Sequence, residues 1–197
     1  LYDLGIAAIL HDLGKKFLPE EIANGKWPLT GKEREAWKSH PKLGAEYLKT
    51  SYHFPAMVYS GILMHHEWFN GEGYPLEKSG RDIPLYARII KVTDSYDAMI
   101  SKRPGREQLS PADAIEYMMA MAGAEFDPQL VNIFLRRMAV YPIGCEVELS
   151  NGQRGIVAKN FRDFSLRPLV QIVETGEMLN LRDDPEGRSV TIGRMIM

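Results

Sequence analysis

Residues 1–15 read LYDLGIAAILHDLGK, an apolar stretch that ends in a histidine–aspartate pair followed by a glycine and a lysine. Its apolar residues, Ala7 and Leu10 among them, recur at the spacing of one helix face. This periodicity predicts an α-helix from Leu1 to about His11. The histidine–aspartate pair therefore falls at the end of a helix, just before Gly14.

The rest of the first 140 residues also has the pattern of helices joined by loops. Thr30-Gly31-Lys32-Glu33 forms a capping box, which predicts a helix that starts there and runs to about His40. Pro41 then opens another helix through Leu48, because proline is tolerated in a first helical turn. Residues 24–28 and 68–82 are rich in glycine, proline and polar groups, so we expect loops there. The remaining expected helices span about residues 55–67, 84–101, 111–122 and 128–138.

The pattern changes at Tyr141-Pro142, where short alternating runs replace the helical spacing. Turn residues such as Asn151-Gly152 separate these runs, as in β-hairpins. We therefore predict a mainly α protein with two parts: a helical bundle over residues 1–140 and a small antiparallel β subdomain over residues 141–197. The second part has no chemical signature, so a structural or partner-contact role is expected. The expected strands are 146–149, 155–158, 169–173 and 178–181.

Composition narrows the class of protein. The 197 residues are 45% hydrophobic and 25% charged, which is close to the globular average, and the net charge of -2 argues against a protein that wraps nucleic acid. A small anionic ligand needs only a few local cations and stays possible. The single cysteine, Cys145, cannot form an intrachain disulfide, so a reducing, cytoplasmic location is expected. The sequence has no apolar run long enough to predict a membrane span.

Histidines and an aspartate at predicted helix ends, together with Asp94 inside the helix expected at 84–101, carry the predicted chemistry. Imidazole and carboxylate without thiolate suit manganese, iron, cobalt, nickel or zinc in a hydrolytic site. A carboxylate such as Asp12 can bridge two cations, and such a pair clamps a phosphoryl group and lowers the pKa of a bound water from 15.7 towards about 7. The candidate metal ligands are His11, Asp12, His40, His65, His66 and Asp94.

Several motifs occur in a fixed order along the chain. His11-Asp12-Leu13-Gly14-Lys15 resembles the signature of the HD phosphohydrolase superfamily. His65-His66-Glu67, followed by Gly71-Glu72-Gly73-Tyr74-Pro75, resembles the extended HD-GYP signature. Asp94-Ser95-Tyr96-Asp97-Ala98 resembles the second aspartate motif of that family. An isolated histidine–aspartate pair is a weak match, but the ordered set is specific, and it covers about residues 1–140.

The resemblance implies an HD-domain helical bundle that hydrolyses cyclic di-GMP to linear pGpG or on to GMP. It implies two or three divalent metal ions, iron or manganese. By this analogy Asp12 bridges two metals. Three histidines hold one metal, and His11 and Asp94 bind the neighbouring metals. The histidines assigned to that one metal are His40, His65 and His66.

The resemblance also implies which side chains meet the substrate. Lys15 would give electrostatic help at the scissile phosphate, and Arg103 and Arg106 would contact phosphates. Tyr74 lies in the expected loop at residues 68–82, called the GYP loop below, which would shape the pocket or dock a cyclase-domain partner. The family more often has tyrosine where this chain has Gly105, which puts one stacking contact in doubt. A homodimer also remains open.

One departure from the family pattern leaves alternatives open. Relatives have a further histidine ligand upstream of the HD motif, and we expect it before Leu1, in a catalytic domain that is incomplete at its N-terminal end. The rival functions are a weak or inactive nucleotide-binding or adaptor module, and a hydrolase of another cyclic dinucleotide. Glu67 is a candidate to orient a ligand imidazole. His53 matches no motif and is expected in a loop.

Overall fold

The computed structural model of the chain describes residues 1–23, 28–103, 105 and 107–196. Its backbone packs into two units, and each is described by itself. The helical unit joins Leu1–Gln108 with Ala120–Val131, and the sheet unit joins Leu109–Met119 with Asn132–Met197. The domain boundary at residue 140 stays a prediction. The mainly α fold with a small antiparallel sheet is confirmed.

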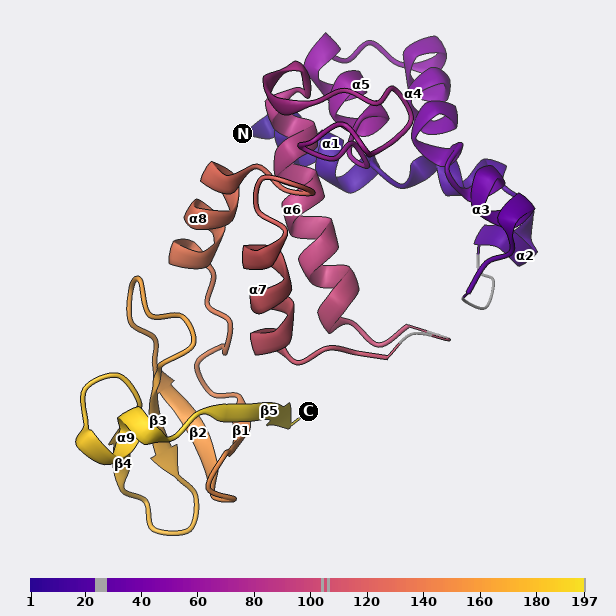
Figure 1. The fold of residues 1–197 in the computed structure, drawn as a ribbon. Helices are drawn as coiled ribbons and strands as arrows, with labels where there is room; N and C mark the ends of the chain where they lie inside the picture. Colours follow the sequence, from indigo (N-terminus) through magenta and orange to yellow (C-terminus); the bar gives the residue numbers. More distant parts are fainter. Residues whose placement is uncertain (24–27, 104, 106, 197) are drawn as a thin grey trace. The chain divides into compact units, whose positions relative to one another are not determined.

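The helices expected from the sequence are present, with ends shifted by a few residues (Figure 1). Those within residues 1–108 belong to the helical unit. The main difference lies at His40, which begins a helix and does not end one. Proline fits within the first turn of a helix, so the residue before Pro41 can already be helical. The elements are α1 (Tyr2–Leu10), η1 (Leu13–Phe17), α2 (Glu20–Ala23), α3 (Gly31–Trp37), α4 (His40–Ser51), α5 (Ala56–Leu63), η2 (Gly80–Asp82) and α6 (Leu85–Ile100).

A small apolar core joins four of these helices. Helix α5 packs against α1, α4 and α6. Ala7 of α1 and Val58 and Ile62 of α5 are fully buried at this contact, and Leu48 and Ile90 close it from α4 and α6. Burial of each large aliphatic side chain contributes about 1.5–3 kcal/mol. The core therefore fixes the helix ends from which the predicted ligands project.

A glycine brings the histidine–aspartate segment against α4. The short helix η1 packs on α4, and a Cβ atom at Gly14 would lie only 1.9 Å from the carbonyl oxygen of His40. No side chain larger than hydrogen fits there, which explains the glycine two residues after Asp12. This close approach places Asp12 beside His40.

The sheet unit holds a five-stranded antiparallel sheet in the order β4-β3-β2-β1-β5. Alternate residues face inwards, so Val147, Leu149, Val170 and Ile172 are buried. The sequence prediction missed α9 and β5, because β5 is recognisable only from its pairing with the distant β1. The elements from α7 onwards are α7 (Pro111–Ala120), α8 (Pro128–Arg137), β1 (Glu146–Leu149), β2 (Arg154–Lys159), β3 (Leu169–Ile172), β4 (Met178–Asn180), α9 (Pro185–Ser189) and β5 (Ile192–Ile196).

Within the described segments, every helix is too short or too polar to cross a lipid bilayer.

Candidate metal centre

All six predicted ligands meet in the helical unit, where they form two clusters. In each cluster, one donor atom from every member lies within 4.8 Å of the others. The histidine-rich cluster consists of Asp12, His40, His65 and His66, and the aspartate-rich cluster of His11, Asp12 and Asp94. Asp12 belongs to both, so its two carboxylate oxygens face two candidate cation positions.

Backbone carbonyl groups orient three of the histidines. The Nδ1 atoms of His11, His40 and His65 lie 2.6, 2.7 and 2.7 Å from the carbonyl oxygen three residues earlier. A carbonyl oxygen only accepts hydrogen bonds, so each Nδ1 carries the proton. In the neutral form of each ring Nε2 therefore turns a lone pair towards the centre, as a metal ligand requires.

The histidine-rich cluster fits a cation. The Nε2 atoms of His40 and His65 lie 3.4 Å apart, and both side chains are fully buried. The same two atoms lie 3.2 and 3.9 Å from Oδ1 of Asp12. Two inward lone pairs beside a carboxylate repel one another in a buried place where water cannot screen them. A divalent cation among these atoms would remove that repulsion. This set of imidazole and carboxylate donors therefore fits a divalent metal ion.

The aspartate-rich cluster has a similar unsatisfied atom. His11 Nε2 is buried, and in the described part of the chain it has no hydrogen-bond partner. It lies 3.5 Å from Oδ2 of Asp12 and 3.6 Å from Oδ1 of Asp94. Burial lowers the pKa of His11, but the attraction of Asp94 and Asp12 outweighs it and raises the pKa above the ordinary value of 6.5.

Electrostatics keep the buried histidines neutral. Burial, with repulsion from His11 and His40, lowers the pKa of His65 to about 3. Burial also holds the pKa of His66 well below 6.5. Burial alone would raise the pKa of Asp12, but the close approach of the His40 ring and the charge of Lys15 bring it far below its usual range. At neutral pH His65 and His66 are thus neutral imidazoles, and the carboxylate of Asp12 beside them is ionised.

Two of the predicted substrate contacts lie at the centre. The Lys15 ammonium group pairs with Asp12 and lies 4.6 Å above the ring of Trp37. The ring of Tyr74 is stacked on that of His66, with centroids 4.8 Å apart and an angle of 21°. Burial raises the pKa of Tyr74, so its hydroxyl stays protonated and can donate a hydrogen bond.

The two predicted arginines differ in what can be said of them. Arg103 donates from Nη2 to Oδ2 of Asp97, 3.3 Å away, and not to a predicted metal ligand. Both of these side chains are well exposed. Arg106 lies outside the described residues. Their role at a phosphate therefore stays a prediction.

The profile of the HD domain family matches residues 1–130. The chain belongs to the HD domain family. Its resemblance to HD-GYP domains is confirmed by relatives. It is 36% identical over 170 residues to a cyclic di-GMP phosphodiesterase of Pseudomonas aeruginosa, and the match covers 86% of this chain and 41% of that one. It is 40% identical over 135 residues to the cyclic di-GMP phosphodiesterase response regulator RpfG of Xanthomonas campestris, covering 68% and 36%.

A solved structure agrees with this assignment. An HDG"Y"P protein of Bdellovibrio bacteriovorus superimposes with a TM-score of 0.54 at 25% identity, over 66% of this chain and 40% of that one. The chain spans about two fifths of the length of each of these relatives. HD domains bind divalent metal ions, in agreement with the two clusters.

Sequence reasoning on this HD domain missed several supporting groups. Lys91, one turn before Asp94 in α6, is buried and donates to Oε1 of Glu125 at 2.5 Å. A lysine in the apolar part of a helix was the available signal, since such a residue needs a partner. The carbonyl groups that orient the histidines leave no trace in side-chain patterns. Glu67 does not contact a ligand imidazole in the described hydrogen bonds; it accepts two backbone N–H groups of the GYP loop.

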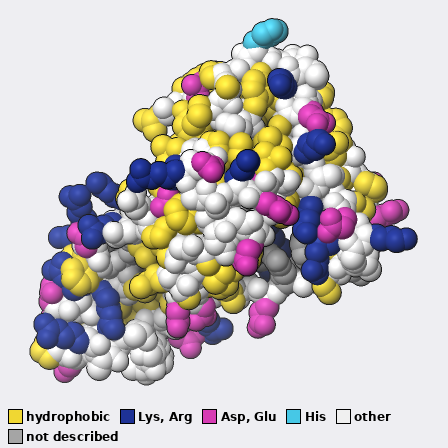
Figure 2. Space-filling model, turned by 45° about the horizontal axis from the view of Figure 1, so that its top comes forward, with side chains coloured by type: hydrophobic (Ala, Val, Ile, Leu, Met, Phe, Trp, Pro, Cys, Tyr) yellow, Lys and Arg dark blue, Asp and Glu magenta, His cyan; other side chains and the backbone are white. Residues whose placement is uncertain are grey.

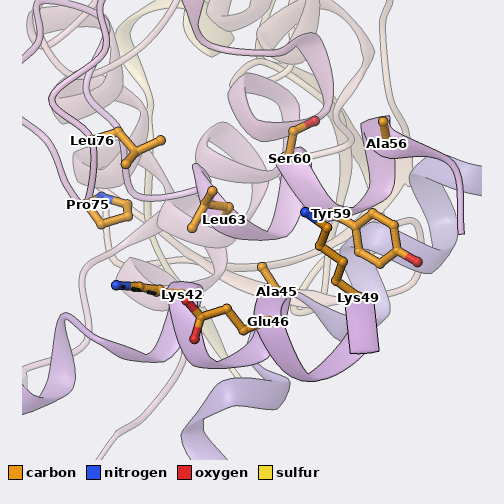
Figure 3. A pocket seen from close by; sticks show the side chains of 10 residues that line it. All are labelled: Lys42, Ala45, Glu46, Lys49, Ala56, Tyr59, Ser60, Leu63, Pro75 and Leu76. Carbon is orange, nitrogen blue, oxygen red and sulfur yellow. Dashed lines mark ion pairs between the residues drawn. The ribbon is translucent and has the colours of Figure 1, made fainter. Parts of the chain in front are cut away.

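A groove of about 500 Å³ lies on the same unit (Figure 3). None of the six predicted ligands lines it, although Pro75 follows Tyr74 directly in the chain. It is therefore a separate feature of the surface formed by α4, α5 and the GYP loop. Its lining residues are Lys42, Ala45, Glu46, Lys49, Ala56, Tyr59, Ser60, Leu63, Pro75 and Leu76.

Proposed function

We propose that this chain is the catalytic part of a metal-dependent phosphodiesterase that hydrolyses cyclic di-GMP to linear pGpG or on to GMP. One observation carries the proposal: two donor clusters share the Asp12 carboxylate. A carboxylate placed in this way suits a pair of divalent ions, of iron or manganese, with a third ion left open. The names of the two relatives support the substrate.

Bound metal ions would neutralise phosphoryl charge and acidify a water molecule for attack on the phosphodiester. The chain's own residues would hold them: His40, His65 and His66 on one side of Asp12, and His11 and Asp94 on the other. The carbonyl bonds at Nδ1 keep three of these histidines aimed inwards, so little reorganisation is needed on binding.

Three other groups would act on the substrate. The ammonium group of Lys15 lies beside Asp12 and over the Trp37 ring. From this position its positive charge would attract the phosphodiester. Tyr74 keeps its proton and would bind or orient the nucleotide next to His66. Arg103 and Arg106 would add phosphate contacts from the segment after α6.

The charge of the molecule suits a small anion. On the face shown in Figure 2, basic and acidic side chains are interspersed, and the net charge of the chain is -2. A small cyclic dinucleotide needs only local cations such as Lys15, whereas a long nucleic acid needs an extended basic surface. We place the protein in the cytoplasm, because its single cysteine is typical of a reducing compartment.

The test is turnover by metal-loaded protein. The chain is loaded anaerobically with iron(II) or manganese(II), mixed with cyclic di-GMP, and the nucleotides are separated by chromatography. We expect pGpG or GMP to appear, and no product with metal-free protein. A panel of other cyclic dinucleotides run in parallel measures base selectivity. Binding of cyclic di-GMP without turnover at full metal occupancy would instead favour an adaptor module.

A further inference from the structure

Glu67 is a buried carboxylate that the proposed chemistry does not use. Only 2% of its surface is exposed. Its Oε1 atom accepts the backbone N–H of Leu76 at 2.6 Å, and its Oε2 atom accepts that of Lys78 at 3.0 Å. Hydrogen bonds to an ionised acceptor are about twice as strong as neutral ones. One side chain thus holds the end of the GYP loop at two points.

The beginning of the same loop is held by backbone groups. Phe69 N–H donates to the carbonyl oxygen of Glu125 at 3.2 Å, and Asn70 N–H donates to that of Ala124 at 2.8 Å. Gly80 N–H closes the loop on the carbonyl oxygen of Phe69 at 2.8 Å. These bonds fix where the loop leaves and re-enters the unit, but they do not reach its middle.

The middle of the loop lies directly against the segment that carries the metal ligands. A Cβ atom at Gly73 would be 2.1 Å from the backbone nitrogen of Trp68, so only glycine allows this approach. Tyr74 N–H donates to the carbonyl oxygen of His66 at 3.2 Å, and the Tyr74 ring stacks on the His66 ring. The Glu67 bonds lie two and four residues further on, so they fix the chain that carries Tyr74.

The far side of this segment is also packed. Pro75 and Leu76 line the groove together with Leu63 of α5, as Figure 3 shows. The segment therefore presents Tyr74 to the metal centre and Pro75 and Leu76 to the groove. If the Leu76 N–H lost its acceptor on Glu67, the position of Tyr74 at the metal centre and the wall of the groove would change together.

We propose that Glu67 is a positioning residue that holds the GYP loop so that Tyr74 covers His66 at the metal centre. This role rests on the proposed function, because Tyr74 is there a substrate contact. It assigns no metal ligation to Glu67: its two carboxylate oxygens are the acceptors for the loop. His11, His40 and His65 would keep their orientation when Glu67 is replaced, since backbone carbonyl groups orient these three ligands.

The experiment compares Glu67→Ala, Glu67→Gln and a matched control, Glu72→Gln. Glu72 lies in the same loop but is exposed, and its carboxylate accepts a hydrogen bond from the side-chain amide of Asn70. Amide hydrogen exchange of Leu76 and Lys78 reports whether the loop end is held. Metal content reports the centre, and kcat and KM with cyclic di-GMP report the substrate contact.

For Glu67→Ala we expect loss of protection at both amides, unchanged metal content, and a kcat/KM lower by roughly 10- to 100-fold, as for a displaced positioning group. Glutamine keeps one acceptor oxygen, so Glu67→Gln should keep one protected amide and part of the activity. It also tests the idea if the alanine variant does not fold. Glu72→Gln should behave as wild type.

Three results would overturn the proposal: protected Leu76 and Lys78 amides in Glu67→Ala, released amides with unchanged kcat/KM, or loss of bound metal in Glu67→Gln. A wild-type protein without turnover would contradict the proposed function instead. The affinity for cyclic di-GMP, measured by calorimetry, would then replace the kinetics, and unchanged affinity in Glu67→Ala with released amides would overturn the positioning role.

Discussion

The two clusters of the candidate metal centre share Asp12 but differ in burial and charge. His40 and His65 of the histidine-rich cluster are fully buried, whereas the side chains of His11 and Asp94 in the aspartate-rich cluster are 19% and 24% exposed. The pKa of His65 is lowered to about 3 and that of His11 is raised. A cation in the first cluster thus displaces no proton from His65 at neutral pH, whereas below the raised pKa of His11 a cation in the second cluster must displace a proton from His11.

This difference predicts an order of loading. A cation entering the histidine-rich cluster displaces no proton from His65 or His66 near neutrality, so these two ligands should add little pH dependence to its affinity. A cation entering the aspartate-rich cluster competes with the proton on His11 and with the Lys15 ammonium group on Asp12. The second cation should therefore bind more weakly as the pH falls through the raised pKa of His11.

The largest effect should come from the residue that the clusters share. Asp12→Asn removes the negative charge from both cation positions while keeping the shape of the side chain. Loss of a bridging carboxylate should cost several kcal/mol of transition-state stabilisation, which corresponds to a fall of about 1000-fold or more in kcat. The fall in kcat is measured with cyclic di-GMP, and metal analysis shows how many ions remain bound. Asp82→Asn, which changes an exposed aspartate, is the control. A variant that keeps two metals and normal kcat would show that Asp12 does not bridge them.

A smaller effect is expected on metal affinity when a ligand of only one cluster is removed, and it should distinguish the two clusters. Structural four-ligand zinc sites bind with about 10–16 kcal/mol, so one lost ligand is worth about 3–4 kcal/mol, or roughly 100- to 1000-fold in affinity. We expect His65→Ala to weaken the tighter metal site by this amount and Asp94→Asn to weaken only the second site. Titration against a chelator, with metal analysis, distinguishes the two. Equal loss of both metals in both variants would mean that the clusters act as one.

Much of the centre could be predicted from the sequence, because its signals are local. The histidines and Asp12 occur at the ends of predicted helices, Asp94 lies inside another, and the order of their motifs along the chain identifies the family. All six predicted ligands meet in the structure. Gly14 belongs to the first of these motifs, although the close approach of His40 that requires a glycine there is visible only in the structure.

The rest depends on partners that are distant in sequence or that belong to the backbone. The contact of Lys91 with Glu125 spans 34 residues, and the pairing of β5 with β1 joins residues that are still further apart in the chain. The carbonyl groups that orient the histidines exist in every residue and carry no sequence signal. Glu67 stands in a known motif, but which atoms it meets is decided by how the following loop folds back.

The smallest effect is the pH dependence of the metal-free protein, and it follows from the opposite pKa shifts of the two clusters. Between pH 6.5 and about 3 the unfolded chain protonates His65 while the folded chain does not, so stability should fall as the pH falls, by up to about 1.4 kcal/mol per pH unit for each such histidine. His66 acts in the same direction. His11 has a raised pKa, so its contribution is complete below 6.5 and is lost as the pH rises through its folded value.

Metal-free protein should therefore be most stable near pH 6.5 and lose stability on both sides. Urea denaturation in the presence of a chelator, from pH 4 to pH 8, measures this curve. His11→Gln should remove the alkaline slope and leave the acid slope, because glutamine does not titrate and His65 stays buried. Below pH 4 the carboxylates of Asp12 and Asp94, whose pKa values are lowered, add a further loss as they protonate. A flat curve between pH 6.5 and pH 4 would mean that the buried histidines reach solvent without their metal, and the contrast between the clusters would then exist only in the metal-bound protein.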